Sequence, residues 1–262
     1  MFLDSLDRSH PLVRACRGAH QWIAPVLDGR RILASPGGYT RFFRTRRAYA
    51  KLPGAEVLKW RASYPCIGDN VATTPFDAHY FYQSVWAADL VRQRQPQWHL
   101  DVGSRIEYVA SLTMLTEVVF LDYRPLPVTL PRFQSLGGTI LALPFDDRSV
   151  PSLSCLHVAE HIGLGRYGDP LDPSGTARAA GELARVLAVG GVLYFSTPVG
   201  RPRVCFNAHR IHQPQQVLNM FSTLRMTGFA AVDDQRRFLP TAHPGDFNGA
   251  DYALGMFSFI KD

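Results

Sequence analysis

The spacing of hydrophobic positions changes near residue 76 and divides the chain into two parts. From there onward, short apolar runs alternate with segments in which apolar residues recur every three or four positions. Runs without polar alternation are typical of strands buried on both faces of a parallel sheet, and the longer spacing is typical of amphipathic helices. The pattern predicts a three-layer, doubly wound α/β domain over residues 76–262.

The apolar runs predict seven strands in this domain. They cover residues 98–102, 117–122, 139–143, 153–158, 191–197, 229–234 and 252–260. The helical spacing predicts helices at 77–94, 105–114, 176–188 and 214–224. Pro96 should end the first of these, because proline cannot continue a helix.

Residues 1–75 lack this regularity and are rich in Arg, Pro and Gly. Short helices are expected near 11–24 and 40–51, with no strand. We therefore expect a basic helical N-terminal extension ahead of the main domain.

Charge is concentrated in the same N-terminal region. The chain has 28 Lys and Arg against 22 Asp and Glu, and residues 1–61 hold 12 of the basic and 4 of the acidic residues. Residues 39–51 interleave basic and aromatic side chains, which could contact an anionic membrane surface or an acidic substrate. A helix with a solvated face packed on the main domain is the alternative. No nucleic-acid recognition motif accompanies the charge, so a nucleic-acid partner is not predicted.

Composition narrows the class of protein further. Hydrophobic residues make up 46% of the chain and charged residues 19%, which is typical of a soluble globular protein. There is no apolar run near the roughly 20 residues that span a bilayer, and the first residues do not resemble a secretory signal. We expect a cytoplasmic location. Residues 39–51 could in addition bring the protein into peripheral contact with the inner face of the membrane.

A possible metal motif, H-x-x-E-H, is formed by His157, Glu160 and His161, in the order found in one class of zinc peptidase. Zinc binding would require both histidines on one face of a helix. The residues before them have a buried-strand pattern, and the glycine-rich segment after them extends a helix poorly. The four cysteines add no C-x-x-C pair. We therefore predict no metal site and place both histidines at the carboxyl edge of the sheet, where ligands bind; a zinc peptidase remains the minor alternative.

A second motif lies where the first strand turns into a helix, at Asp101 and Gly103. A glycine turn can direct backbone N–H groups into the crevice above a parallel sheet. Asp122 follows Asp101 by 21 residues and ends the second strand, where an acidic residue can bind ribose hydroxyls. The full G-x-G-x-x-G pattern is absent, which argues against a dinucleotide. These residues predict a nucleoside pocket, unless Asp122 is a loop acid without a ligand.

Four segments, in order and at compatible spacing, resemble class I S-adenosylmethionine-dependent methyltransferases. They are LDVGSR, VVFLDYRPL, GTILALPFDDRSVPSLSCLHVAEHI and ELARVLAVGGVLYFSTPVG. With DAHYFYQSVWA, GLGRYGDP and FNAHRIH they are also similar to a poorly characterised methyltransferase-like family, a domain of unknown function often associated with bacterial cell-surface polysaccharide synthesis. The resemblance covers residues 76–262. It implies a seven-stranded, mostly parallel sheet whose last strand is antiparallel, with S-adenosylmethionine as the cofactor.

The resemblance also implies roles for individual residues. The methionine portion of the cofactor would be held by Asp101, Gly103 and Ser104, and the ribose by Asp122. Tyr123, Ile140 and Leu143 would border the adenine, and His157 would lie near the sulfonium. The later glycines of the first motif are missing, and Thr139 stands where many relatives have Asp.

His161 is the predicted general base, because its ordinary pKa lies near neutral pH. Glu160 would orient it or bind the acceptor, although the two could form only a structural hydrogen-bonded pair. Acceptor recognition is assigned to residues after the fourth and fifth strands, each of which could instead have a structural role: Arg166, Tyr167, Asn207, His209 and Arg210. Their chemistry suits a sugar bearing phosphate or carboxylate.

The predicted function is methyl transfer from S-adenosylmethionine to an oxygen acceptor, such as a sugar hydroxyl of a surface glycan or its precursor. The alternative is a non-catalytic protein with the same fold that acts as a scaffold in polysaccharide assembly. Binding of the cofactor distinguishes the two.

Overall fold

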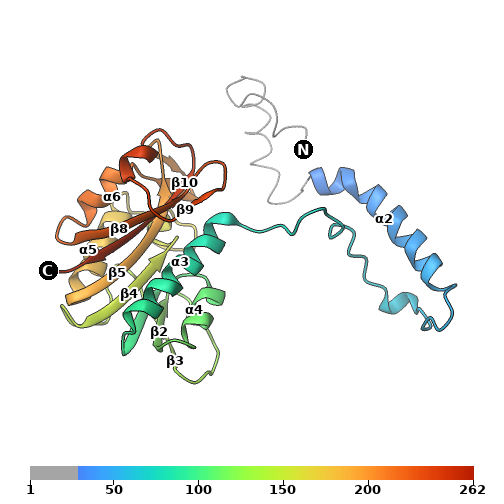
Figure 1. Cartoon of the computed structure of the whole chain (residues 1–262), viewed down its shortest axis with the longest axis horizontal. Coiled ribbons are helices and arrows are strands. Elements are labelled where there is room, and N and C mark those ends of the chain that lie inside the picture. Colours follow the sequence, from blue (N-terminus) through green and yellow to red (C-terminus); the bar gives the residue numbers. More distant parts are fainter. Residues whose placement is uncertain (1–28) are drawn as a thin grey trace. The chain divides into compact units, whose positions relative to one another are not determined.

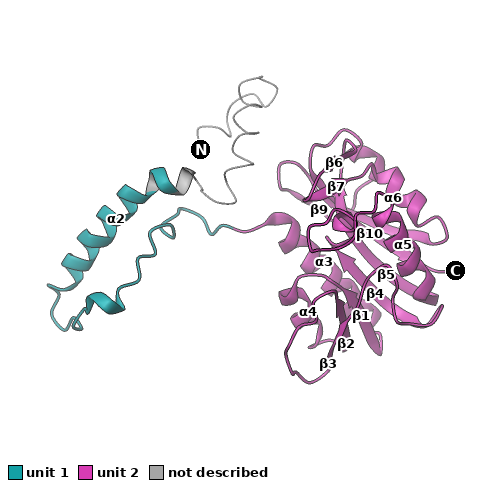
Figure 2. Cartoon of the chain, turned by 180° about the vertical axis from the view of Figure 1, so that it is seen from behind, with its two compact units in different colours: residues 1–75 teal, residues 76–262 magenta. Residues whose placement is uncertain are grey.

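The computed structural model describes residues 29–262, apart from the side chains of residues 29–31 and 34. The chain forms two compact units, Met1–Pro75 and Phe76–Asp262 (Figure 2). The helix expected near residues 11–24 lies outside the described residues.

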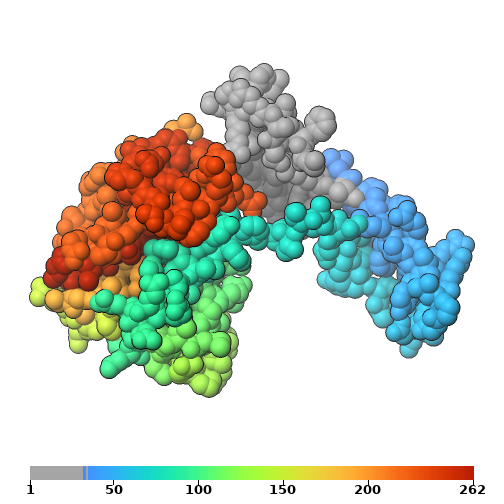
Figure 3. Space-filling view, in the orientation of Figure 1, coloured from blue at the N-terminus to red at the C-terminus, as the bar shows by residue number. Residues whose placement is uncertain are grey.

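The described part of the first unit is a helix followed by a return segment, residues 50–75. Helix α2, Gly29–Tyr49, covers most of the helix predicted near 40–51, but it begins earlier, continues through Pro36 and ends at Tyr49. The return segment, which contains the short helix η1 (Trp60–Ala62), packs back on α2 (Figure 3). The guanidinium of Arg46 lies 3.8 Å from the centre of the Trp60 ring, and its Nη2 donates to the Leu58 carbonyl at 2.6 Å. Part of the predicted basic face therefore holds this unit together.

The second unit contains an eight-stranded sheet in the order β3-β2-β1-β4-β5-β10-β8-β9. Its first five strands are parallel, and β10 is antiparallel to both β5 and β8. The bounds are β1 Trp98–Val102, β2 Glu117–Asp122, β3 Phe133–Gly137, β4 Val150–Leu156, β5 Leu187–Val199, β8 Arg225–Val232, β9 Phe238–Leu239 and β10 Ala253–Ile260. The predicted fold is confirmed, including the antiparallel last strand. The two-residue strand β9 and a separate hairpin, β6 (Arg203–Cys205) with β7 (His209–Ile211), were not predicted.

Helices cover both faces of the sheet (Figure 1). Helices α3 (Ala78–Arg94) and α4 (Ile106–Leu112) pack on one face, and α5 (Gly175–Val186) and α6 (Pro214–Met220) pack on the other. The carboxylate of Asp77 caps α3 by accepting the backbone N–H groups of His79 and Tyr80, at 3.0 and 3.3 Å. Gln95, in the left-handed conformation, ends the helix just before Pro96, as predicted.

The strand predicted at residues 139–143 is wrong, because the third strand is β3 at 133–137. As an edge strand bonded only to β2, β3 is half-exposed and needs no apolar run. Ile140 and Leu143 are apolar because they reach the core from a loop. The Leu143 N–H donates to Glu182 Oε2 at 2.9 Å, so a side chain takes the place of a strand partner.

Candidate functional site

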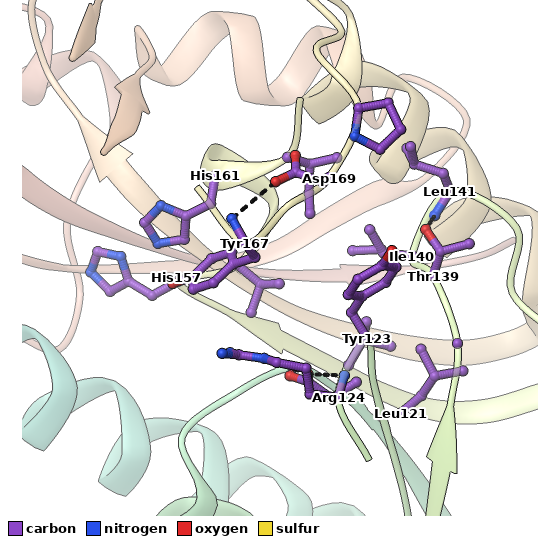
Figure 4. A pocket seen from close by; sticks show the side chains of 17 residues that line it. Leu121, Tyr123, Arg124, Thr139, Ile140, Leu141, His157, His161, Tyr167 and Asp169 are labelled. Carbon is purple, nitrogen blue, oxygen red and sulfur yellow. Dashed lines mark hydrogen bonds and ion pairs between the residues drawn. The ribbon is translucent and has the colours of Figure 1, made fainter. Parts of the chain in front are cut away.

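A pocket opens at the carboxyl ends of β1, β2 and β4, and the loops that follow these strands form its walls. It encloses about 820 Å³ with its open mouth included. His157, His161 and Tyr167 lie on one side, with Tyr123, Thr139 and Ile140 facing them (Figure 4). This is the sheet edge at which ligands bind in doubly wound folds.

Gly103 and Asp122 share one wall of this pocket. Gly103 has a φ of +68°, which favours glycine, and its N–H donates to the Leu121 carbonyl at 2.9 Å. A Cβ at this position would lie 3.0 Å from Val158 Cγ1 and 3.6 Å from Asp122 Oδ2. Asp122 Oδ1 accepts the N–H of Arg124 at 2.7 Å, which orients the carboxylate. The structure therefore brings together the two positions that the sequence placed at a common edge.

Asp101 lies behind this wall and is 0% exposed. Its carboxylate accepts the N–H of Ser104 at 3.0 Å and the hydroxyl of Ser154. Ser154 also contacts His99 Nε2 at 2.8 Å and the Tyr108 hydroxyl at 3.3 Å. Burial raises the pKa of Asp101 to about 6, although its hydrogen bonds to Ser154 and Ser104 oppose the shift. The same burial lowers the pKa of His99 to about 3, so this histidine is neutral.

Three residues predicted to contact the cofactor therefore support the pocket from behind. Asp101 and Ser104 shape the turn before α4, and Leu143 is part of the hydrophobic core. Their side chains are directed to protein groups, and none of the three lines the pocket; their predicted contact with the cofactor stays a prediction.

The loop at residues 162–172 forms the opposite rim. Gly163, Gly165 and Gly168 all have positive φ, and the Asp169 carboxylate accepts the N–H groups of Gly163 and Tyr167, at 2.6 and 3.2 Å. The Tyr167 ring contacts two guanidinium groups, those of Arg124 at 4.9 Å and Arg166 at 5.1 Å. Arg124 belongs to the wall with Asp122, so this contact joins the two rims across the pocket.

Arg210 has a different position from the one predicted. Its buried guanidinium donates to the carbonyls of Ile162 and Asp172, at 2.5 and 2.9 Å, and to Thr176 Oγ1 at 3.3 Å. Because these bonds anchor both ends of the loop, the group is not available to an acceptor. This corrects its assignment to acceptor binding. Asn207 is exposed in the β6–β7 turn with a φ of 60°, a conformation that asparagine tolerates, and it does not line the pocket.

Three ionisable side chains lie close together just after β4. His157 follows the strand with a φ of 59°, and its Nδ1 lies 2.5 Å from Glu160 Oε1. Glu160 is 0% exposed within the short helix η2 (Ala159–His161). His161 directs Nε2 at Glu160 Oε1 at 3.7 Å and Nδ1 at the Ala208 carbonyl at 2.5 Å. Burial acts to raise the pKa of Glu160, but the two histidines outweigh it and the pKa is lowered.

Aromatic rings and one guanidinium surround this cluster, and Arg166 Nη1 lies 3.3 Å from His161 Nδ1. The His157 ring contacts His79 and Tyr80, with ring centres 5.5 and 5.1 Å away. His209 contacts Tyr252 at 5.0 Å and is partly buried. Burial lowers the pKa of His79 and of His209 to about 4.

Several buried polar atoms near the ends of β4 and β5 have no hydrogen-bond partner among the described residues. They are His157 Nε2, Glu160 Oε2, Thr197 Oγ1 and His212 Nε2. Unpaired buried groups of this kind are rare in folded proteins and call for an explanation, such as a bound molecule. Within residues 29–262, no group of three or more His, Cys, Asp or Glu side chains has metal-binding geometry.

Seven of the predicted residues thus line one pocket: Gly103, Asp122, Tyr123, Ile140, His157, His161 and Tyr167. Arg124 and Asp169 were missed, although both lie inside segments that carry the resemblance, LDYRPL and GLGRYGDP.

Comparisons with known proteins found one matching family model and similar solved structures. Residues 149–238 match a family model described as a Caenorhabditis protein of unknown function, DUF268. A search of curated proteins found no match.

Among solved structures, the chain is similar to the [4+2]-cyclase SpnF at 15% identity and a TM-score of 0.49, covering 66% of this chain and 79% of that one. It is also similar to the 1,6-didemethyltoxoflavin-N1-methyltransferase of Burkholderia thailandensis, which was solved with S-adenosylhomocysteine. The identity is 13% and the TM-score 0.46, and the match covers 73% of this chain and 94% of that one. A third similar structure is the N-methyltransferase NodS of Bradyrhizobium japonicum WM9, which was solved with the same compound. The identity is 12% and the TM-score 0.48, and the match covers 83% of this chain and 97% of that one.

Proposed function

We propose that this protein is an S-adenosylmethionine-dependent methyltransferase. The observation that carries the proposal is the wall shared by Gly103 and Asp122 at the carboxyl ends of β1 and β2. The resemblance of the sequence to class I methyltransferases assigns these two positions to the methionine and ribose portions of the cofactor.

The residues present fit such a molecule. Gly103 lines the pocket without a side chain, so its backbone is open to a ligand, and a Cβ there would crowd Val158 at 3.0 Å. Asp122 Oδ1 accepts the N–H of Arg124, whereas Oδ2 has no backbone partner within residues 29–262, an arrangement suited to ribose hydroxyls. Leu121 and Ile140 give the same pocket an apolar surface for a base.

When bound, the cofactor supplies an electrophilic methyl group. The protein must align the acceptor with that methyl group and remove a proton from a hydroxyl acceptor. The cluster of His157, Glu160 and His161 stands at the same pocket and offers groups for the proton transfer. We propose an oxygen acceptor, a sugar hydroxyl of a glycan or its precursor. The guanidinium of Arg210 is bonded to the loop at residues 162–172, so this buried cation gives no reason to prefer an anionic sugar over a neutral one.

Calorimetry with S-adenosylmethionine and S-adenosylhomocysteine tests the proposal. Both should bind, and Asp122→Asn should weaken both by about 10- to 100-fold, because a hydrogen bond to a charged group contributes about 1.5–3 kcal/mol. Asp246→Asn is the matched control, since Asp246 is exposed in the helix η3 (Pro244–Phe247) and does not line the pocket. If the wild-type protein binds neither compound, the scaffold alternative is favoured. Screening glycan precursors with labelled cofactor then identifies the acceptor.

We also propose that the first unit contacts an anionic membrane surface. In the described part of the chain, no helix is long and apolar enough to cross a bilayer. Arg44, Arg47 and Lys51 are exposed on or just after α2, and Phe43 and Trp60 are 51% and 64% exposed. Basic residues near an anionic surface contribute about 1 kcal/mol each, and aromatic rings insert at the interface.

Vesicle sedimentation of the full chain tests this contact. Binding to vesicles with roughly 30 mol% phosphatidylserine should exceed binding to pure phosphatidylcholine and fall with salt. Arg44→Gln with Arg47→Gln should weaken binding by about 30-fold, from about 1 kcal/mol per charge. Arg92→Gln with Arg178→Gln removes the same charge from the second unit and should have little effect. Equal binding to both vesicle types would contradict the proposal.

A further inference from the structure

His157 combines three unusual properties in one residue. It is a non-glycine residue with a φ of 59°, a conformation that costs energy and is concentrated at functional sites. Its N–H donates to the Ser196 carbonyl at 3.0 Å, which holds this backbone in place. The side chain is 4% exposed, yet the residue lines the pocket and its Nε2 has no hydrogen-bond partner among the described residues.

The neighbouring carboxylate determines which nitrogen carries the proton. Glu160 has a lowered pKa, so it is ionised at neutral pH and can only accept hydrogen bonds. Nδ1 of His157, 2.5 Å from Glu160 Oε1, must therefore be the protonated nitrogen. In the neutral imidazole, the unpaired Nε2 then bears a lone pair. A carboxylate that fixes a histidine in this way is the arrangement that prepares it to take a proton.

His161 lacks a carboxylate hydrogen-bonded to its ring. Its Nδ1 lies 2.5 Å from the Ala208 carbonyl and 3.3 Å from Arg166 Nη1. Its Nε2 lies 3.7 Å from Glu160 Oε1, which is beyond hydrogen-bond distance. Of the two histidines, only His157 is therefore held by the carboxylate of Glu160.

We propose that His157, and not His161, is the general base of the reaction and that Glu160 is its positioning residue, an inference that rests on the proposed methyl transfer. The acceptor oxygen bonds to the methyl carbon as the carbon–sulfur bond breaks and leaves its electron pair on sulfur. The hydroxyl proton passes to Nε2 of His157, and Glu160 offsets the charge of the imidazolium.

Two groups that pack on His157 from α3, His79 and Tyr80, do not compete for this proton. Glu160 contacts its ring from η2. Burial, followed by the charge of His157, lowers the pKa of His79 to about 4. Burial, followed by Glu160, raises the pKa of Tyr80. The first is a weak base, and the second keeps its own proton.

Nitrogen NMR of the full chain with labelled histidine tests the inference without any acceptor. Spectra are recorded over a series of rising pH, up to the point at which the ring of His157 is neutral, with S-adenosylhomocysteine present; His157→Gln identifies the relevant signals by their loss. We expect Nδ1 of His157 to be protonated and Nε2 to be bare. Glu160→Gln should bring in the tautomer with a protonated Nε2, because a glutamine amide can donate to Nδ1. A protonated Nε2 in the wild type, or an unchanged tautomer in Glu160→Gln, overturns the inference.

Turnover with an acceptor found by the labelled-cofactor screen gives a second test. His157→Gln should reduce kcat by about 10²- to 10⁴-fold, the usual contribution of a general base. Its affinity for S-adenosylhomocysteine should change by less than about ten-fold, since a base acts mainly on the chemical step. His243→Gln, at an exposed position before η3, is the control and should keep full turnover. If His157→Gln keeps wild-type kcat, this inference fails while the proposed function stands; if the wild type binds no cofactor, the proposed function itself fails.

Discussion

Replacing Gly103 with alanine tests the pocket wall directly. The position has a φ of +68°, and the left-handed conformation costs alanine about 1–2 kcal/mol. The added Cβ would also lie 3.0 Å from Val158 Cγ1, so Val158 must shift. We therefore expect two separate effects, a loss of stability from the backbone and a loss of ligand affinity from the crowded wall.

Gly190→Ala separates the two effects. Gly190 has a φ of +72° at a bend within β5, and a Cβ there would meet no atom within 4 Å. Both variants should lose about 1–2 kcal/mol of unfolding free energy in urea, and Gly103→Ala should lose about 1–3 kcal/mol more because its Cβ also crowds Val158. Only Gly103→Ala should lose affinity for S-adenosylhomocysteine, because only there does the added methyl group alter the pocket wall.

Calorimetry on the two folded variants provides the comparison. Wild-type affinity in Gly103→Ala would refute the assignment of this turn to the ligand. Equal losses of affinity in both variants would show that backbone strain, and not the position of the Cβ, is responsible.

Two further predictions concern residues behind the pocket. Arg210→Met should lower the free energy of unfolding by about 2–4 kcal/mol, because the carbonyls of Ile162 and Asp172 lose charge-assisted hydrogen bonds. Proteolysis within residues 162–172 should also become faster. A loss of unfolding free energy below about 1 kcal/mol would contradict the anchoring role of Arg210. The pKa of Asp101 is raised from 3.8 to about 6 in the folded protein, so the folded state binds the extra proton and stability falls as pH rises between these values. Asp101→Asn removes this titration, and relative to it the wild type should lose up to ~3 kcal/mol from pH 4 to pH 7, as followed by urea unfolding; parallel pH curves for the two proteins would rule this out.

Most strands of the second unit could be predicted because central strands are buried and rich in apolar residues. β1 and β2 coincide with their predicted ranges. The edge strand β3 could not be found this way, since one free edge and partial exposure remove the apolar signal. The apolar residues at 139–143 have the same composition as a strand but pack from a loop, and no local pattern distinguishes the two.

The site was predictable where geometry follows from chain order. Gly103 and Asp122 meet because parallel strands end at one edge of the sheet. Arg210 was misassigned because an arginine in a loop suggests an exposed cation, whereas its partners are backbone carbonyls far away in the sequence. Asp101 shows the same limit, because only the fold reveals that Ser154 and Ser104 enclose it.

The position of β10 has a consequence for how the protein is made. It is the last strand of the sheet in chain order, yet it pairs along both edges, with β5 and with β8. Until residues 253–260 have emerged from the ribosome, these neighbours keep open backbone edges, which are prone to wrong pairing. The sheet of the second unit therefore stays incomplete during synthesis until residues 253–260 are available. A ribosome that stalls before residue 253 would leave an aggregation-prone fragment.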